Sequence, residues 1–403
     1  MILVIIYACT EPIPLKTVNF ESALVVEGTL TNQNETQKIK LSRTYLLEDT
    51  EPIIENNATV WVENNNGDVY QFVHASEGVY TSTIPFASEE NIFYKLHIST
   101  QDGNEYESTE VQLTSESQID NLYAELTTND EGENGIQVYI DNFNQNSSAE
   151  YFRYEYEETY KIIAPNYSSQ DITISNYNYS EFTGEITYDI DITYREQEEQ
   201  TCYINKKGIG LILATSENYE TNSLERIPIK FIPTDDGSIR ERYSINVKQF
   251  VQSVEAYTFY KAIEDLGNVQ SILTQSQPGY INGNIKSINS TSEKIIGYFD
   301  ISSTTSKRVY FNYFDFGIPK PEYLYECQTK VLDYGDATTL DEDPNERITL
   351  YQDVYLRNFK LSYYSEAQIS PITGEPTIYE ITNPECGDCT TLGSNIEPDF
   401  WED

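Results

Sequence analysis

Short runs in which apolar and polar side chains alternate recur along most of the chain, and this pattern limits the fold more than any other feature. Successive side chains of a β-strand point to opposite faces, so a period of two predicts strands with one buried face. Gly, Asn and Asp residues separate the runs, as they do at turns between strands. We therefore predict a mainly β protein: an immunoglobulin-like or prealbumin-like sandwich at residues 24–117, followed by a larger β-rich domain at residues 118–403 with one short helix.

The clearest pair of predicted strands is a hairpin in the first domain. Residues 59–62 and 69–73 alternate, and residues 64–68 between them contain an Asn-Gly pair. Asn-Gly accepts the positive φ angles of a type I′ turn, so we expect such a turn to join the two strands. In a later run every second residue from Ile92 to Ile98 is apolar, which places His97 on the solvent side.

One segment shows the period of a helix. Ser253 is suited to cap its start, and Glu255 lies in the first turn, where a negative charge is favourable. Gly267 is expected to end the helix. An apolar stripe lies between these points: Ala256, Phe259, Tyr260, Ile263 and Leu266. We expect this stripe to pack on a sheet.

An aromatic run at residues 152–157 permits two interpretations. Phe152, Tyr154 and Tyr156 alternate with Arg153, Glu155 and Glu157. Exposed tyrosines in a row are typical of carbohydrate-binding surfaces, but strict alternation favours a strand whose aromatic face belongs to the core. We predict that the aromatic face is core and that the charged face points outward.

Cys9 ends an apolar run, residues 2–8, and polar sequence follows it directly. Such an arrangement is typical of a bacterial lipoprotein signal, so we interpret residues 1–9 as a signal that ends at the lipidated Cys9, and residues 10–23 as a tether. No Lys or Arg precedes the run, which is atypical. The alternative is an N-terminal strand with a buried free cysteine. A transmembrane helix is excluded, because it needs about 20 apolar residues.

The net charge of the chain limits the classes of partner that it can bind. The 66 acidic and 25 basic residues give a formal net charge of −41. Such a surface repels phosphate groups, which argues against nucleic acid as a partner and against attachment to anionic lipids through basic patches. We therefore expect any membrane attachment to depend on the acyl chains of Cys9.

Four further cysteines remain: Cys202, Cys327, Cys386 and Cys389. In an exported protein an even number predicts two disulfides, and three connectivities are possible. We therefore expect the larger domain at residues 118–403 to end in a disulfide-bearing C-terminal tail. The Cys-x-x-Cys spacing of the last two also suits a zinc site or a redox pair. A zinc site needs a second ligand pair nearby, however, and both histidines, His74 and His97, are distant in the sequence. A redox pair is expected to open a helix in a βαβ unit, whereas here a proline precedes it.

The motifs of common enzymes are missing from the sequence. It contains no nucleophile elbow, phosphate loop, dinucleotide fingerprint or zinc-protease helix, and we predict no catalytic residue, metal or cofactor. A pair of carboxylates for a glycosidase is the alternative, but no spacing nominates one. The acidic run at residues 341–346 suits calcium by its oxygen atoms, yet it lacks the glycine and register of a known loop, so we interpret it as a solvated turn.

Several fragments, in order along nearly the whole chain, resemble an uncharacterised family of Bacteroidetes outer-membrane lipoproteins, the family of domain of unknown function 4249. The fragments are Leu24-Val25-Val26-Glu27-Gly28, Leu41-Ser42-Arg43-Thr44, Arg242-Tyr243-Ser244 with Val247-Lys248-Gln249, Gly283-Asn284-Ile285, Gly297-Tyr298-Phe299, Lys307-Arg308, and Cys386-Gly387-Asp388-Cys389 with Pro398-Asp399-Phe400-Trp401. The shortened signal region departs from the family pattern and leaves the true start of the protein open.

The resemblance implies a lipid-anchored protein of the outer membrane that faces the cell surface. Genes of this family tend to neighbour those of TonB-dependent transporters, and the family brings no catalytic residues with it. We expect a non-enzymatic accessory or binding subunit of an outer-membrane β-barrel complex, either a TonB-dependent transporter or an assembly or export machine. The alternatives are a free-standing glycan- or peptide-binding lipoprotein and a carboxylate-based hydrolase.

Overall fold

A computed structural model of the protein describes residues 22–45, 53–143, 148–179, 186–217, 223–267, 281–333, 362–369 and 376–403. Cys9, the predicted signal at residues 1–9, most of the predicted tether and the acidic run at residues 341–346 lie outside these ranges. The described part is mainly β, as the alternating pattern predicts. It contains no helix that is long and apolar enough to cross a membrane.

The first sheet has eleven strands. They are β1 (Leu24–Thr31), β2 (Lys38–Arg43), β3 (Ile53–Ile54), β4 (Thr59–Asn64), β5 (Val69–Ser76), β6 (Val79–Ser82), β7 (Phe93–Ser99), β8 (Glu105–Ser108), β9 (Val111–Gln112), β19 (Ile285–Ser287) and β20 (Ile295–Ser302). The main order is β19-β8-β7-β4-β5-β6-β2-β1-β20. The two end strands, β19 and β20, pack against each other, so the sheet curls into a nearly closed, barrel-like sandwich.

Two strands of this sandwich come from a distant part of the sequence. β20 pairs with β1 in parallel, and β19 pairs with β8 in the antiparallel sense. Ile295, Phe299 and Ile301 of β20 are buried in the same core as Leu24 and Val26 of β1. The boundary between residues 117 and 118 stays a prediction, but strands from beyond it complete the sandwich that begins before it.

The predicted hairpin is present, with a different turn. β4 pairs with β5 in the antiparallel sense. The side-chain Oδ1 of Asn64 accepts hydrogen bonds from the backbone N–H groups of Asn66 (3.0 Å) and Asp68 (2.9 Å). Only Gly67 of this loop has a positive φ, +88°. The expected type I′ turn is wrong, because the Asn64 side chain closes a longer loop in which one residue with positive φ is sufficient.

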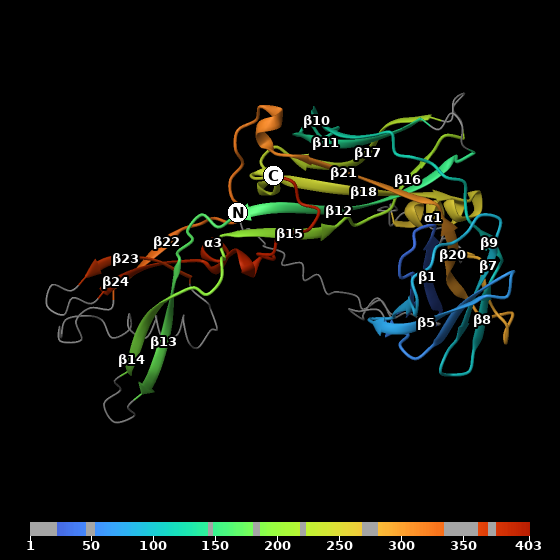
Figure 1. The fold of residues 1–403 in the computed structure, drawn as a ribbon, viewed down its shortest axis with the longest axis horizontal. Coiled ribbons are helices and arrows are strands. Elements are labelled where there is room, and N and C mark those ends of the chain that lie inside the picture. Colours follow the sequence, from blue (N-terminus) through green and yellow to red (C-terminus); the bar gives the residue numbers. More distant parts are fainter. Residues whose placement is uncertain are drawn as a thin grey trace, which may run out of the picture.

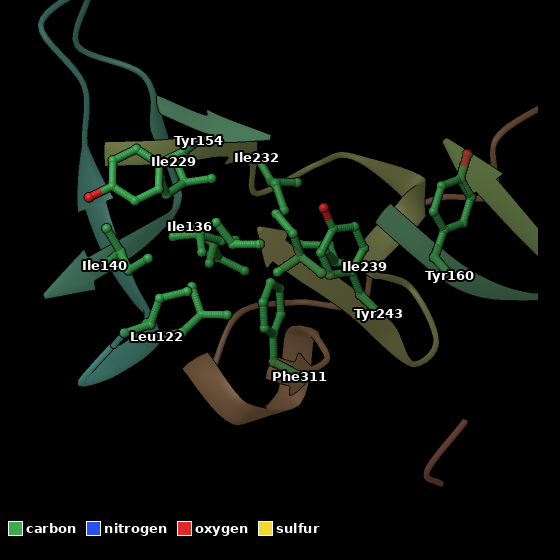
Figure 2. Close-up of a cluster of buried hydrophobic side chains, with 14 of the residues drawn as sticks. Leu122, Ile136, Ile140, Tyr154, Tyr160, Ile229, Ile232, Ile239, Tyr243 and Phe311 are labelled. Atoms are coloured by element: carbon green, nitrogen blue, oxygen red, sulfur yellow. The ribbon is translucent and has the colours of Figure 1, made fainter. Parts of the chain in front are cut away.

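A second sandwich follows the first. One sheet contains β10 (Asn121–Thr128), β11 (Asn134–Phe143) and β17 (Ser223–Pro233). The other contains β12 (Tyr151–Ile163), β15 (Thr201–Lys207), β16 (Ile212–Thr215), β18 (Tyr243–Gln252) and β21 (Thr304–Phe311). The short helices η1 (Gly237–Ile239) and η2 (Tyr313–Phe316) lie beside them. Figure 2 shows side chains of both sheets meeting in one core, with Leu122 and Ile136 on one side and Tyr243 and Phe311 on the other.

The aromatic run of β12 belongs to this core, as predicted. Phe152 and Tyr154 are fully buried, and Tyr156 packs against them from the margin. The opposite face of the strand is not wholly exposed, however. Arg153 is only 7% exposed, because a helix covers that end of the sheet. The prediction of an outward charged face is therefore wrong at Arg153.

The remaining elements extend from the second sandwich. They are the hairpin of β13 (Gln170–Tyr179) and β14 (Ile186–Tyr194), the sheet of β22 (Thr329–Asp333), β23 (Ser362–Ile369) and β24 (Pro376–Thr382), and the short helices α3 (Pro384–Gly387) and η4 (Cys389–Thr391). Figure 1 shows an elongated molecule, with the first sandwich at one end, these elements at the other, and β12, β15, β18 and β21 between them.

The four cysteines form two disulfides, Cys202–Cys389 and Cys327–Cys386. The first joins β15 to η4, and the second joins the segment before β22 to α3. Cys386 and Cys389 thus bond to different partners, so the Cys-x-x-Cys spacing is neither a zinc ligand pair nor a redox pair. Within the described ranges, no three or more His, Cys, Asp or Glu side chains are grouped as metal ligands.

Candidate functional site

The helix α1 (Val254–Gly267) begins and ends where the sequence predicts. The Ser253 hydroxyl oxygen accepts a hydrogen bond from the backbone N–H of Ala256 (3.1 Å), which caps the first turn. Ala256 and Phe259 of the predicted stripe are buried, whereas Ile263 is 37% exposed. The helix packs on β12, β18 and β20, and therefore lies where the two sandwiches meet (Figure 1).

An open groove of about 540 Å³ runs beside this helix. Its walls are α1, the segment before β19, the residue that follows β8 and the middle of β20. The lining residues are Thr109, Val254, Glu255, Thr258, Phe259, Ala262, Ile281, Asn282, Gly283, Asn284 and Tyr298. Clefts of this size with a mostly apolar lining, placed where two domains meet, are the usual binding sites of proteins.

Two glycines allow the walls of the groove to come together. A Cβ atom on Gly283 would lie 1.6 Å from the carbonyl oxygen of Gly297. The Asn284 side chain makes the two hydrogen bonds to Phe299 that the backbone of a paired strand would otherwise make. Its Oδ1 accepts from the Phe299 N–H, and its Nδ2 donates to the Phe299 carbonyl, both at 2.8 Å. The family fragments at residues 283–285 and 297–299, to which sequence reasoning gave no role, thus build this wall side by side.

The groove is suited to contact rather than to acid–base chemistry. Glu255 carries the only formal charge among its lining residues, and Tyr298 contributes a phenol whose pKa is raised to about 12 by burial. A glycosidase needs two carboxyl groups within about 10 Å of each other across its cleft. A second hollow of about 270 Å³ lies between the sandwiches, and Glu116 is the only acidic residue in its lining. Neither hollow offers the pair that a carboxylate-based hydrolase requires.

The two tryptophans are not free platforms for a sugar ring. Trp61 stacks on His97 across β4 and β7, with ring centroids 5.0 Å apart. His97 lies on the outer face of the sheet, as expected, yet its side chain is only 17% exposed, and burial lowers its pKa. Trp401 is 8% exposed and packs edge-on against Tyr203. Both rings are therefore used within the protein.

A buried polar cluster lies on the other side of α1. The guanidinium of Arg153 is 4.1 Å from the ring centre of Phe250 and 5.1 Å from that of Tyr260. Asp300 of β20 is 2% exposed, and its carboxylate accepts a hydrogen bond from the Ser302 hydroxyl (2.8 Å). Burial raises the pKa of Asp300, and the Ser302 hydroxyl and the positive charge of Arg153 only partly oppose this rise.

An Asp300→Asn variant is expected to stabilise the protein at neutral pH. Because the folded-state pKa of Asp300 is raised, the carboxyl favours folding most when it is protonated, and this stability is lost as pH rises through the folded pKa. Asparagine keeps the shape and an acceptor for Ser302 without the buried charge. The free energy of unfolding should increase by about 1 kcal/mol at pH 7, and the gain should vanish at about pH 3, below the unfolded-state pKa of the carboxyl. Denaturant unfolding at both pH values measures this.

Asp102→Asn is the matched control, with the opposite sign. The Thr100 hydroxyl donates a hydrogen bond to Asp102 and lowers its pKa, so this carboxylate contributes stability above its unfolded pKa that is lost in acid. The control variant should be less stable than the wild type at pH 7 and equal to it at low pH. A clear loss of stability in Asp300→Asn at pH 7 would instead mean that a charged Asp300 pairs favourably with Arg153.

The residues that sequence reasoning selected are not brought together in one site. Cys9 lies outside the described residues, and the four other cysteines are structural bridges away from the groove. Sequence reasoning missed Arg153 and Asp300. Arg153 carried a possible signal, because it is the one basic residue among the acidic side chains on its face of the aromatic run, but alternation assigned that face to solvent.

The model of a protein family described as Domain of unknown function (DUF4249) matches residues 10–308 of the 403. The match includes every residue of the groove beside α1 and ends within β21, before β22, β23 and β24. No curated protein matches the chain.

Proposed function

The chain belongs to the family described as Domain of unknown function (DUF4249), and from this premise we propose that it works by contact. It is a lipid-anchored, surface-exposed outer-membrane protein that acts as a non-enzymatic accessory or binding subunit. Its partner is an outer-membrane β-barrel complex, either a TonB-dependent transporter or an assembly or export machine. The anchor is the acylated Cys9, whose chains contribute about 0.8 kcal/mol for each buried methylene.

The observation that carries this proposal is the open groove beside α1. Its apolar side chains, among them Val254 and Ile281, are accessible at a junction that is fixed on both sides by packed sheets. Apolar surface held in a concave, preformed shape favours association because little ordering is needed on binding. Its position within the residues that match the family model fits a role shared by the family.

Charge determines which partner surface suits this groove. The chain carries a net charge of −41, and Glu255 is exposed at the rim. A partner loop with an apolar side chain for the groove and Lys or Arg around it therefore matches both features. Such rim charges speed association and add modest affinity. A stable complex should bury more than about 1,000 Å² in total.

The test is purification of the tagged native protein from membranes in mild detergent, followed by identification of the proteins that accompany it. A barrel protein should copurify with the wild-type protein in stoichiometric amount. The Thr258→Arg variant, which places a bulky cation in the groove, should stay in the membrane fraction. The amount of barrel protein that copurifies with it should fall at least about tenfold, equivalent to about 1.4 kcal/mol of binding free energy. Cys9→Ala should leave the membrane fraction altogether.

Thr83→Arg is the matched control, since Thr83 is an exposed threonine of the first sandwich outside the groove. This variant should retain the barrel. If Thr258→Arg and Thr83→Arg behave alike, the groove is not the contact. Purification of the wild type as a lone monomer that binds or hydrolyses a glycan or peptide would overturn the proposed function itself.

A further inference from the structure

Cations gather on one outer surface of this strongly acidic protein. Lys161 of β12, Arg242 just before β18 and Arg308 of β21 lie close together on the five-stranded sheet, on the face away from its core. The backbone N–H of Lys161 donates to the backbone carbonyl of Arg242 (2.8 Å), and the Arg308 guanidinium donates to the Ser244 hydroxyl (2.7 Å). The rings of Tyr203 and Tyr310 lie among them: Tyr203 pairs with Lys161 across the strands, and Arg242 is 5.3 Å from the Tyr310 ring centre. We name the surface formed by Lys161, Arg242, Arg308, Tyr203 and Tyr310 the basic-aromatic face.

The last residues of the described chain occupy this face. The Trp401 ring packs edge-on against Tyr203 and Tyr310, with centroids 4.9 and 5.9 Å away. The guanidinium of Arg308 is 3.7 Å from the ring centre of Phe400. Two neighbouring aromatic side chains are thus held by one face, one between tyrosines and one beneath a cation.

One ion pair and several hydrogen bonds also hold the tail on the face. The Asp403 carboxylate is 2.8 Å from the Lys161 ammonium, and Arg242 donates from Nε to the Glu402 carbonyl (3.0 Å). The Tyr203 hydroxyl donates to the Glu397 carboxylate (2.6 Å), and the Tyr310 hydroxyl donates to the Phe400 carbonyl. Side chains therefore hold this segment, as they hold a bound peptide.

From these contacts we propose that the basic-aromatic face is a peptide-binding site whose resident ligand is the tail at residues 395–403. The ligand that it recognises is a segment with two adjacent aromatic side chains flanked by carboxylates. The outside occupant is an acidic aromatic segment of this kind on another protein, which binds when the tail leaves. The groove beside α1 is a separate site, so this inference is independent of the proposed function.

The disulfide Cys202–Cys389 explains why the tail is the resident ligand. It fixes the chain to β15 a few residues before the tail begins. A ligand tethered by so short a linker has an effective concentration in the millimolar range. A free segment of similar intrinsic affinity therefore binds only when the contacts between the tail and the basic-aromatic face are weakened.

The experiment uses the full chain with the double substitution Phe400→Ala and Trp401→Ala, which removes both rings of the tail and leaves the face intact. The probe is a fluorescein-labelled peptide with the sequence of residues 395–403, followed by anisotropy. We expect a micromolar dissociation constant for the double variant and at least about tenfold weaker binding to wild type, whose site is occupied. A peptide with alanines in place of its Phe and Trp should not bind.

Two further substitutions in the same background locate the site. Arg308→Ala should weaken peptide binding at least about tenfold, because it removes the cation over the phenylalanine ring. Lys207→Ala is the matched control: Lys207 is a cation of the same sheet whose side chain is 83% exposed and pairs with Glu157 rather than with the tail. The control should bind the peptide as the double variant does.

Absence of binding to a double variant that unfolds cooperatively would overturn the proposal, as would equal effects of Arg308→Ala and Lys207→Ala. Should the double variant fail to fold, the milder Asp403→Asn takes its place, because Asp403 is exposed and its loss removes only one ion pair of the tail. That variant should bind the peptide more tightly than wild type does, and unchanged binding would overturn the proposal equally.

Discussion

A Gly283→Ala variant should lose at least about 3 kcal/mol of unfolding free energy. The added Cβ would lie 1.6 Å from the Gly297 carbonyl oxygen, which is backbone and has no rotamer by which to move away. Moving the segment outward would break the pair of hydrogen bonds between Asn284 and Phe299. Because β19 begins two residues after Gly283 and β20 contains Gly297, the substitution separates the two strands that close the first sandwich. Thermal and denaturant unfolding measure the loss.

Gly103→Ala is the control for this prediction. Gly103 has a positive φ of +85°, which disfavours other residues, but a Cβ there would meet nothing within 4 Å. Its substitution should therefore cost only about 1 kcal/mol, from backbone strain. A loss of only about 1 kcal/mol in Gly283→Ala would show that the backbone relieves the close approach of residues 283 and 297 at little cost, and would contradict the prediction.

Removal of the Cys202–Cys389 disulfide is expected to have the second large effect. The bridge closes a loop with a sequence separation of 187 residues, and Cys202 and Cys389 are fully buried. In the chain-entropy account, such a loop restricts the unfolded chain strongly, and its loss costs about 2–5 kcal/mol. The double substitution Cys202→Ala with Cys389→Ala should therefore lower the unfolding free energy by this amount and also loosen the tail on the basic-aromatic face.

The other bridge provides the comparison. Cys327–Cys386 spans a separation of only 59 residues, so its removal should cost about 1 kcal/mol less on entropic grounds. Alkylation of the unreduced, denatured wild type followed by mass mapping should label none of the four cysteines. A labelled Cys386 or Cys389, or a larger loss on removal of the shorter loop, would contradict this assignment of roles.

The local features of the fold could be predicted from sequence because neighbours in the chain decide them. Alternation at residues 59–62 and 69–73 predicted the starts of β4 and β5, although both strands run further, to Asn64 and Ser76. Ser253 with Gly267 predicted the ends of α1. Each of these depends on backbone geometry within a few residues. The turn after Asn64 was wrong because its side-chain hydrogen bonds compete with the backbone preference of the Asn-Gly pair.

The candidate sites were beyond the reach of such patterns. The groove needs Gly283 beside Gly297 and α1 beside both, and the basic-aromatic face needs Lys161, Arg242 and Arg308 on three neighbouring strands. Nothing in the spacing of these residues indicates that they are neighbours. Alternation also assigned Arg153 to solvent, because a period of two separates the faces of a strand without saying what covers either of them.

The sequence by itself thus determined that the chain is mainly β, that one helix runs from about residue 254 to 267, that four cysteines suit two bridges, and that the surface is strongly acidic. Only the tertiary structure decided that β20 pairs with β1, that Cys202 bonds to Cys389, and that the tail covers a basic face. The physical reason is that strand and helix periods are properties of adjacent residues. Pairing between distant strands is chosen by burial of apolar faces, which many registers and partners satisfy equally well until the whole core is assembled.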